Sequence, residues 1–111
     1  MGWDVNYRWT KKADVVADLL GQYSTNPSLE VLAFKSTSSG LWTVIRNQNT
    51  GSRAIYFDLI ERRGKQFAVK GMDEAMGPYY YDCPAKFFTM VPVGNPAYRA
   101  RWAEAHGVKL S

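Results

Sequence analysis

The 111-residue sequence predicts a single α+β domain with an N-terminal helix, a four-stranded antiparallel meander sheet and two C-terminal helices. Two observations predict this class. The spacing of apolar residues is helical near the N-terminus, alternates across the middle of the chain and becomes helical again after position 84. Short connections that contain glycine separate the alternating runs, which favours hairpins. A chain of this length buries one core, so residues 1–111 form one domain.

The first predicted element is a helix that begins after Thr10, a residue type that caps helices well. Its apolar residues recur at helical spacing, with charged residues on the opposite face. Asn26-Pro27 ends the helix, because the residue before a proline is disfavoured in the α conformation. The predicted buried face consists of Ala13, Val16, Ala17, Leu20 and Tyr23.

Alternating runs then predict four strands, at residues 29–36, 41–47, 53–62 and 66–72. Turn-forming residues separate each run from the next. The segment 2–9 also alternates large and polar residues, and it is a candidate fifth strand at an edge of the sheet.

Two further helices are predicted after the sheet. Pro84 is favoured in the first turn of a helix, and Asp82 or Cys83 can cap it. Asn95-Pro96 gives the same signal for a terminal helix, which Gly107 ends. The helices most simply cover one face of the sheet. In the last helix one face is predicted to carry Tyr98, Trp102 and Ala105.

Composition indicates a soluble, cytoplasmic protein. The formal charge of +4 permits an attraction to nucleic acid but does not require one. The single cysteine excludes an internal disulfide, which suits a reducing compartment. No apolar run is long enough for a membrane span, and the first nine residues lack the apolar core of a signal peptide. We therefore expect no membrane partner.

One hypothesis is a small hydrolase or thiol enzyme centred on Asp73, Glu74, Asp82 and Cys83. A thiol at a helix start is activated by the helix dipole, and His106 is the only histidine that could serve as its base. However, the adjacent Asp82 opposes thiolate formation, and cysteine is among the most buried residue types. The carboxylates do not have the spacing of a calcium loop, and glycine-rich phosphate-binding motifs are absent. We therefore predict no catalytic residue, metal or cofactor.

A second hypothesis is nucleic-acid binding through the predicted strands. Basic side chains there alternate with aromatic rings, and a basic sheet with exposed rings is a common way to bind single-stranded nucleic acid. Asp58 and Glu61 dilute the positive charge. The candidate contacts are Trp42, Arg46, Arg53, Tyr56, Arg62 and Lys70.

The leading hypothesis is a non-enzymatic binding module that contacts a protein partner, or a second copy of the chain, through the loop between the sheet and Cys83. Three consecutive tyrosines cannot all point into one core, and tyrosine is favoured at protein contacts. We expect the segment 71–84 to be ordered, with Asp73 or Glu74 accepting backbone amides. The candidate binding residues are Met72, Asp73, Glu74, Met76, Tyr79, Tyr80 and Tyr81.

The same loop resembles a motif of a small family of uncharacterised proteins from bacterial plasmids, integrated elements and phages. The resemblance rests on the run GMDEAMGP at residues 71–78, on Cys83-Pro84 and on Trp102 in the last helix. Ala75, where the family has serine, and the three tyrosines depart from the pattern. The resemblance implies a mobile-element context and an accessory role, and it implies no mechanism.

Overall fold

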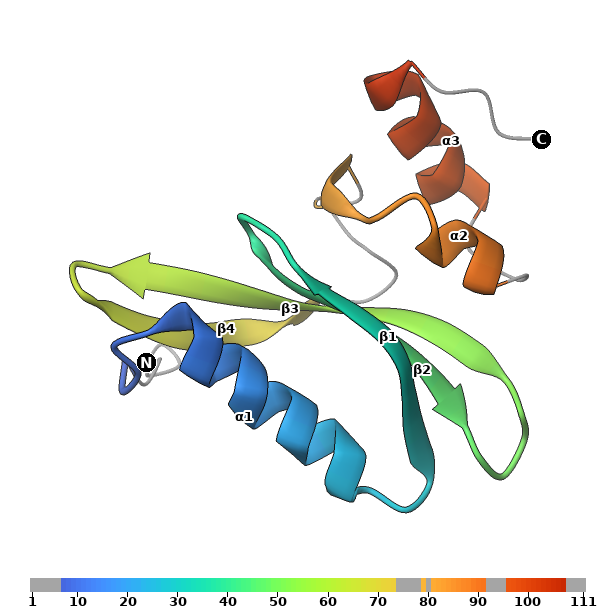
Figure 1. Cartoon of the computed structure of the whole chain (residues 1–111). Helices are drawn as coiled ribbons and strands as arrows, with labels where there is room; N and C mark the ends of the chain where they lie inside the picture. Colours follow the sequence, from blue (N-terminus) through green and yellow to red (C-terminus); the bar gives the residue numbers. More distant parts are fainter. Residues whose placement is uncertain (1–6, 74–78, 80, 92–95, 108–111) are drawn as a thin grey trace, which may run out of the picture.

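The four strands form one open sheet with helices before and after it, which confirms the predicted α+β class (Figure 1). The computed structural model describes residues 7–73, 79, 81–91 and 96–107. Neighbouring strands are antiparallel, in the order β1-β2-β3-β4. The elements are α1 (Lys12–Thr25), β1 (Leu29–Ser36), β2 (Gly40–Asn47), β3 (Arg53–Arg63), β4 (Gln66–Asp73), α2 (Phe87–Met90) and α3 (Pro96–His106).

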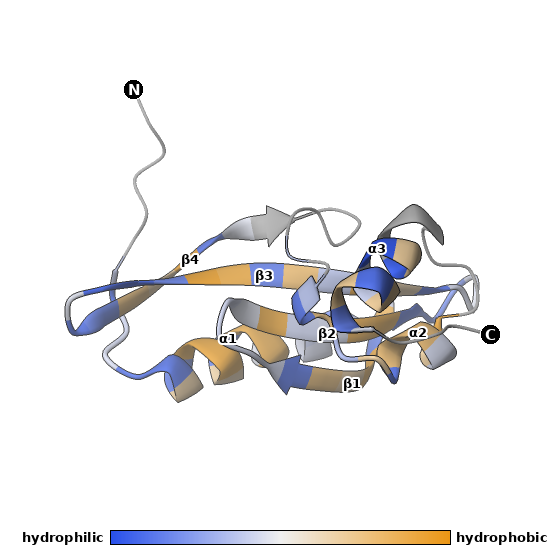
Figure 2. Ribbon diagram, turned by 90° about the horizontal axis from the view of Figure 1, so that it is seen from above, coloured by the Kyte–Doolittle hydropathy of each residue, from blue (hydrophilic) through white to orange (hydrophobic). Residues whose placement is uncertain are grey.

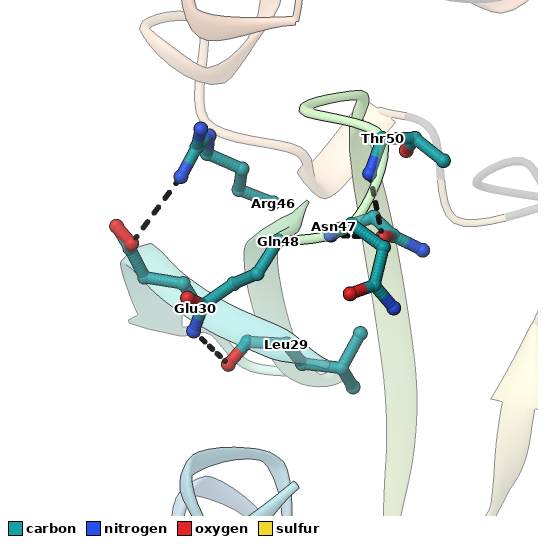
Figure 3. Close-up of polar contacts among 7 residues, drawn as sticks. Leu29, Glu30, Arg46, Asn47, Gln48 and Thr50 are labelled. Atoms are coloured by element: carbon teal, nitrogen blue, oxygen red, sulfur yellow. Dashed lines mark hydrogen bonds and ion pairs between the residues drawn. The ribbon is translucent and has the colours of Figure 1, made fainter. Parts of the chain in front are cut away.

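The turns of the meander are short and well bonded. Between β2 and β3, the Asn47 side-chain oxygen accepts the backbone amides of Asn49, at 2.9 Å, and Thr50, at 3.2 Å (Figure 3). Two residues connect β3 to β4, and the first of them, Gly64, has a φ of 62° that favours glycine. These turns fix the hairpin geometry that the sequence predicts.

In the described part of the candidate fifth strand, residues 7–9, one isolated bridge joins the segment to the sheet. Trp9 pairs with Phe67 beside β4, with backbone N–O distances of 3.4 and 2.7 Å. Residues 2–6 of the candidate strand lie outside the described residues. The bridge brings the end of the N-terminal segment against the β4 edge of the sheet.

The helices lie on both faces of the sheet, so the expectation that they share one face is wrong. Figure 1 shows α1 below the sheet and α2 and α3 above it. The reason lies in β2, whose first six residues are all buried. Its neighbouring residues Leu41 and Trp42 belong to two different apolar clusters, because successive side chains of a strand point to opposite faces. A strand buried on both faces needs cover on both.

The α1 side of the sheet is mainly aliphatic. Val15 and Leu19 of α1 pack against Leu41 of β2 and Ile60 of β3. The predicted face of the helix was partly wrong, because Ala13 and Ala17 are exposed and the larger Val15 and Leu19 are buried instead.

The start of α1 also differs from the prediction. The capping position is Lys11, not Thr10, and its side chain makes no capping hydrogen bond. The helix ends at Thr25, directly before Asn26-Pro27, as predicted. Packing on the sheet, and not a side-chain cap, therefore stabilises the first turn.

The opposite side of the sheet is rich in aromatic side chains. The Trp42 and Phe57 rings lie 4.4 Å apart, and Trp102 of α3 meets Phe88 of α2 edge to face at 5.4 Å. The remaining buried members of this aromatic cluster are Val44, Cys83, Phe87, Val91 and Ala103.

The C-terminal helices match their predictions in part. The helix expected from Pro84 is a single turn, α2, whose capping residue is Lys86, so neither Asp82 nor Cys83 caps it. Helix α3 starts at Pro96 and ends before Gly107, whose φ is 63°, as predicted. On α3, Trp102 is buried but Ala105 is exposed, and the side chain of Tyr98 lies outside the described part. None of the helices that the structure describes is long and apolar enough to cross a membrane.

Candidate functional site

Tyr79, Tyr81 and Asp82 are the described residues of the predicted binding loop beyond β4, and the side chains of Tyr79 and Asp82 fasten the loop to the body of the fold. The Tyr79 ring packs against Phe57 of β3 with ring centres 5.0 Å apart. The Asp82 carboxylate accepts hydrogen bonds from the hydroxyls of Thr37 and Ser39, in the turn between β1 and β2. One side chain thus anchors the segment on the sheet face, and a second anchors it on a turn of the sheet.

Tyr81 lies between these two anchors and is 48% exposed. Its backbone carbonyl accepts a hydrogen bond from Nε2 of His106 in α3. This bond requires a proton on Nε2, because a carbonyl can only accept. The His106 ring is itself stacked on Trp102, with centres 4.4 Å apart and planes 21° apart. The backbone at Tyr81 is therefore held by α3 while its ring reaches the surface.

The structure describes only part of the predicted loop. Met72 and Asp73 form the end of β4, although their side chains are not among the described features. Glu74, Met76 and Tyr80 lie outside the described residues. The expected bonds from Asp73 or Glu74 to backbone amides therefore stay a prediction.

Cys83 is a buried structural residue. It is 2% exposed and belongs to the aromatic cluster beneath α2 and α3. Burial, with a smaller contribution from the charge of Asp82, raises the pKa of the Cys83 thiol to about 12. His106 contacts Tyr81 and Trp102 instead of the thiol. The arrangement keeps the thiol protonated and inaccessible, which disfavours the thiol-enzyme hypothesis.

Among the three carboxylates of the enzyme hypothesis, Asp82 is the one whose side chain the structure describes. Asp82 is engaged with two hydroxyls of the β1–β2 turn. Within the described ranges, no group of three or more histidine, cysteine, aspartate or glutamate side chains is placed to hold a metal ion.

A buried carboxylate lies elsewhere, under α1, where sequence reasoning had placed only a surface charge. Asp58 of β3 is 4% exposed and accepts a hydrogen bond of 2.7 Å from the Tyr23 hydroxyl of α1. Burial raises the pKa of Asp58, and the hydrogen bond from Tyr23 partly offsets this. Burial and the neighbouring Asp58 also raise the pKa of Tyr23. The signal in the sequence was the position of Asp58 within an otherwise apolar strand.

The aromatic candidates for nucleic-acid stacking do not form a platform. Trp42 is fully buried in the aromatic cluster, so the expectation that it lies on an exposed face is wrong. Tyr56 is half-buried, and its ring lies 6.3 Å from that of Tyr23 on the α1 side. The two rings therefore belong to opposite faces of the sheet, because Trp42 pairs with Phe57, the neighbour of Tyr56.

The basic candidates do not form one continuous face either. Arg46 and Arg53 are cross-strand neighbours at one end of β3, whereas Arg62 lies about 30 Å along the same strand and points to the other face. Arg46 lies 3.8 Å from Glu30 (Figure 3), and the guanidinium of Arg53 donates to the Met90 carbonyl at 3.0 Å. Lys70 of β4 forms a separate ion pair with Glu61 of β3, at 3.7 Å. A sheet-wide nucleic-acid surface is thus not supported.

Comparisons with protein-family models, curated proteins and solved structures find no match to the chain. The resemblance of residues 71–84 to a mobile-element family therefore stays a prediction, and function has to be argued from the geometry.

Proposed function

We propose that the protein is a non-enzymatic binding module that docks onto a protein partner through the surface around Tyr81. The observation that carries this proposal is a tyrosine residue that is 48% exposed and whose backbone is held by a bond from α3 and by the bonds of the neighbouring Asp82. Its neighbours are Tyr79, packed on Phe57, and Asp82, bonded to the β1–β2 turn. In the mobile-element context that the resemblance implies, the partner is a cytoplasmic protein of the host or of the element.

A fixed aromatic side chain is favourable for binding for two reasons. Tyrosine offers a large apolar area and a polar hydroxyl with few rotatable bonds, and it is enriched among the residues that dominate binding energy. The bond from His106 to the Tyr81 carbonyl also reduces the backbone freedom that binding would otherwise remove. Preorganisation of this kind increases affinity without adding a contact.

The surroundings of Cys83 support a binding role over a catalytic one. The thiol is buried, its pKa is raised, and the Asp82 carboxylate and the His106 imidazole are committed to hydrogen bonds that hold the backbone on either side of the Tyr81 ring. The polar side chains of this region thus serve to place Tyr81.

Phe34 offers a matched control for Tyr81. It is an aromatic residue with a similar exposure, 51%, but it belongs to the edge strand β1 and not to the surface around Tyr81. Single exposed apolar residues are common on protein surfaces and carry no functional meaning by themselves.

The test is affinity capture of partners from cells that carry the gene, quantified by mass spectrometry, with three variants. Tyr81→Ala is expected to reduce recovery of the specific partner about tenfold or more, because truncation of a central aromatic contact costs about 2 kcal/mol. His106→Ala should give a smaller loss, since it removes the bond that positions Tyr81 and the stacking on Trp102 but leaves the Tyr81 ring in place. Phe34→Ala should match the unmodified protein.

Two outcomes would contradict the proposal. Tyr81→Ala recovering as much partner as the unmodified protein would show that this surface is not used. A loss with Phe34→Ala alone would place the contact on β1. If the partner is a second copy, size-exclusion chromatography of the purified protein should show a dimer that Tyr81→Ala dissociates.

A further inference from the structure

The tip of the β3–β4 hairpin is strongly basic. Arg62, Arg63 and Lys65 occupy three of four consecutive positions, with Gly64 between them, and all four residues are exposed. The connection is only two residues long, so the strand ends are held close together and the cations cannot spread apart. In Figure 1 this hairpin extends from the body of the fold, away from α2 and α3.

The positive charge of the tip is not neutralised by the described carboxylates. Glu61, the nearest acidic residue in sequence, is already engaged: one oxygen lies 3.7 Å from Lys70 and the other accepts the Tyr7 hydroxyl at 2.7 Å. The ion pairs that the described ranges contain involve Arg8, Arg46 and Lys70, and none involves a cation of the tip.

Contacts within the hairpin region hold the two arginines in place. The Arg62 guanidinium carbon lies 5.7 Å from the centre of the Phe67 ring, and its Nε donates to the Gly64 carbonyl at 2.8 Å. The Arg63 guanidinium carbon lies 5.6 Å from the centre of the Tyr7 ring. Because successive residues of a strand point to opposite faces, the tip presents one supported arginine on each face of the ribbon.

We propose that this tip binds double-stranded DNA by entering the major groove, where Arg62, Arg63 and Lys65 contact backbone phosphates. The major groove of B-DNA, about 12 Å wide, admits a two-stranded β-ribbon. Phosphates line both of its walls, so a ribbon with cations on both faces is neutralised on both sides. A flat acidic protein or a membrane surface would neutralise only one face.

This inference is independent of the proposed contact at Tyr81. The tip belongs to β3 and β4, whereas Tyr81 is held by α3 and by the β1–β2 turn. It also narrows the nucleic-acid hypothesis: of the six residues that the sequence suggested, only Arg62 belongs to the binding tip.

The experiment measures binding of the purified protein to a fluorescent DNA duplex of about 20 base pairs by anisotropy, between about 50 and 200 mM salt. Three phosphate contacts predict a slope of about −2.7 for log K against log salt concentration. The triple variant Arg62→Gln, Arg63→Gln, Lys65→Gln should lose at least about tenfold in affinity at the lowest salt, and its slope should approach zero.

A matched triple variant, Lys35→Gln, Arg46→Gln, Lys86→Gln, removes the same formal charge away from the tip. It should bind DNA within about threefold of the unmodified protein and keep the slope. Because Arg62 also packs on Phe67, the double variant Arg63→Gln, Lys65→Gln provides a second measurement that leaves this contact intact, and its slope should be reduced by about two-thirds.

Several results would overturn the proposal. These are an affinity for duplex DNA that does not change with salt, an equal loss in the matched and tip variants, or no loss in folded tip variants. Equal or tighter binding to double-stranded RNA, to polyglutamate or to vesicles that contain phosphatidylglycerol would also overturn it. The deep, narrow major groove of A-form RNA does not admit the ribbon, so RNA is the most stringent of these competitors.

Discussion

The two helical layers of this protein differ in chemistry and in what they leave at the surface. The α1 layer is aliphatic and encloses one buried carboxylate, Asp58, with its partner Tyr23. The layer of α2 and α3 is aromatic, and it holds a segment whose Tyr81 ring is exposed. Figure 2 shows apolar residues on the strands and on the helices of both layers. The α1 layer therefore covers one face of the sheet, whereas the layer of α2 and α3 covers the other face and also holds the proposed binding residue Tyr81.

The two layers meet at the turn between β1 and β2. The Lys12 ammonium of α1 donates to the carbonyl of Thr37, and the Thr37 hydroxyl donates to Asp82 of the segment before α2. The turn is therefore the place where a change in one layer can reach the other, whereas the apolar clusters themselves lie on opposite faces of the sheet.

The largest effect is expected from truncations in the two clusters. Phe87→Ala should lower the unfolding free energy by about 3–5 kcal/mol, and Leu19→Ala by about 2–5 kcal/mol, because both side chains are buried. Since the clusters lie on opposite faces, the double variant should cost the sum of the two within about 0.5 kcal/mol in urea denaturation. A coupling above about 1 kcal/mol would mean that the layers are not independent.

Asp58 should make stability depend on pH through the α1 layer. Its pKa is raised in the folded state, so the folded protein binds more protons than the unfolded chain as pH rises from the ordinary value of 3.8. The Asp58 contribution to the unfolding free energy therefore falls across that window, by at most about 1.4 kcal/mol per pH unit. Asp58→Asn should gain stability relative to the unmodified protein with rising pH.

The control is Asp14→Asn, which removes an exposed carboxylate of the same α1 layer. Its stability difference from the unmodified protein should change much less with pH. The stability of each variant relative to the unmodified protein is measured by urea denaturation at a series of pH values. If the stability differences of Asp58→Asn and Asp14→Asn change with pH in the same way, Asp58 is not the source of the pH dependence.

Cys83 should give the smallest effect on stability. Cys83→Ser places a hydroxyl where a thiol is buried in the aromatic layer and should cost about 1 kcal/mol while leaving binding intact. The native thiol should react with a disulfide reagent only as fast as the protein opens. Rapid stoichiometric modification near neutral pH would show an accessible thiolate and reopen the enzyme hypothesis.

Most of the fold was predictable from local patterns. Turn residues and alternation gave the four strands to within one residue at each end, and proline and glycine marked both ends of α3. These signals are local, because turn geometry and helix termination depend on a few neighbouring residues.

The errors concern long-range packing. The run from Leu41 to Ile45 was divided into a core face and an exposed face, but it is buried throughout, because helices cover both faces. Trp42 was therefore assigned to the surface, although it is buried. Asp58 was taken for an exposed charge, because nothing in the local sequence shows that Tyr23, 35 residues away, donates a hydrogen bond to it. The bonds that fix Tyr81 involve residues from an early turn and the last helix, and spacing in the sequence does not connect them.

The most direct test of the central claim is site-specific photocrosslinking in cells that carry the gene. A photoreactive phenylalanine analogue replaces Tyr81 in one variant and Phe34 in the other, two aromatic positions of similar exposure. We expect an adduct of defined mass with a protein at position 81 and none at position 34. An adduct at position 34 alone, or at neither position, would contradict a protein-binding surface at Tyr81.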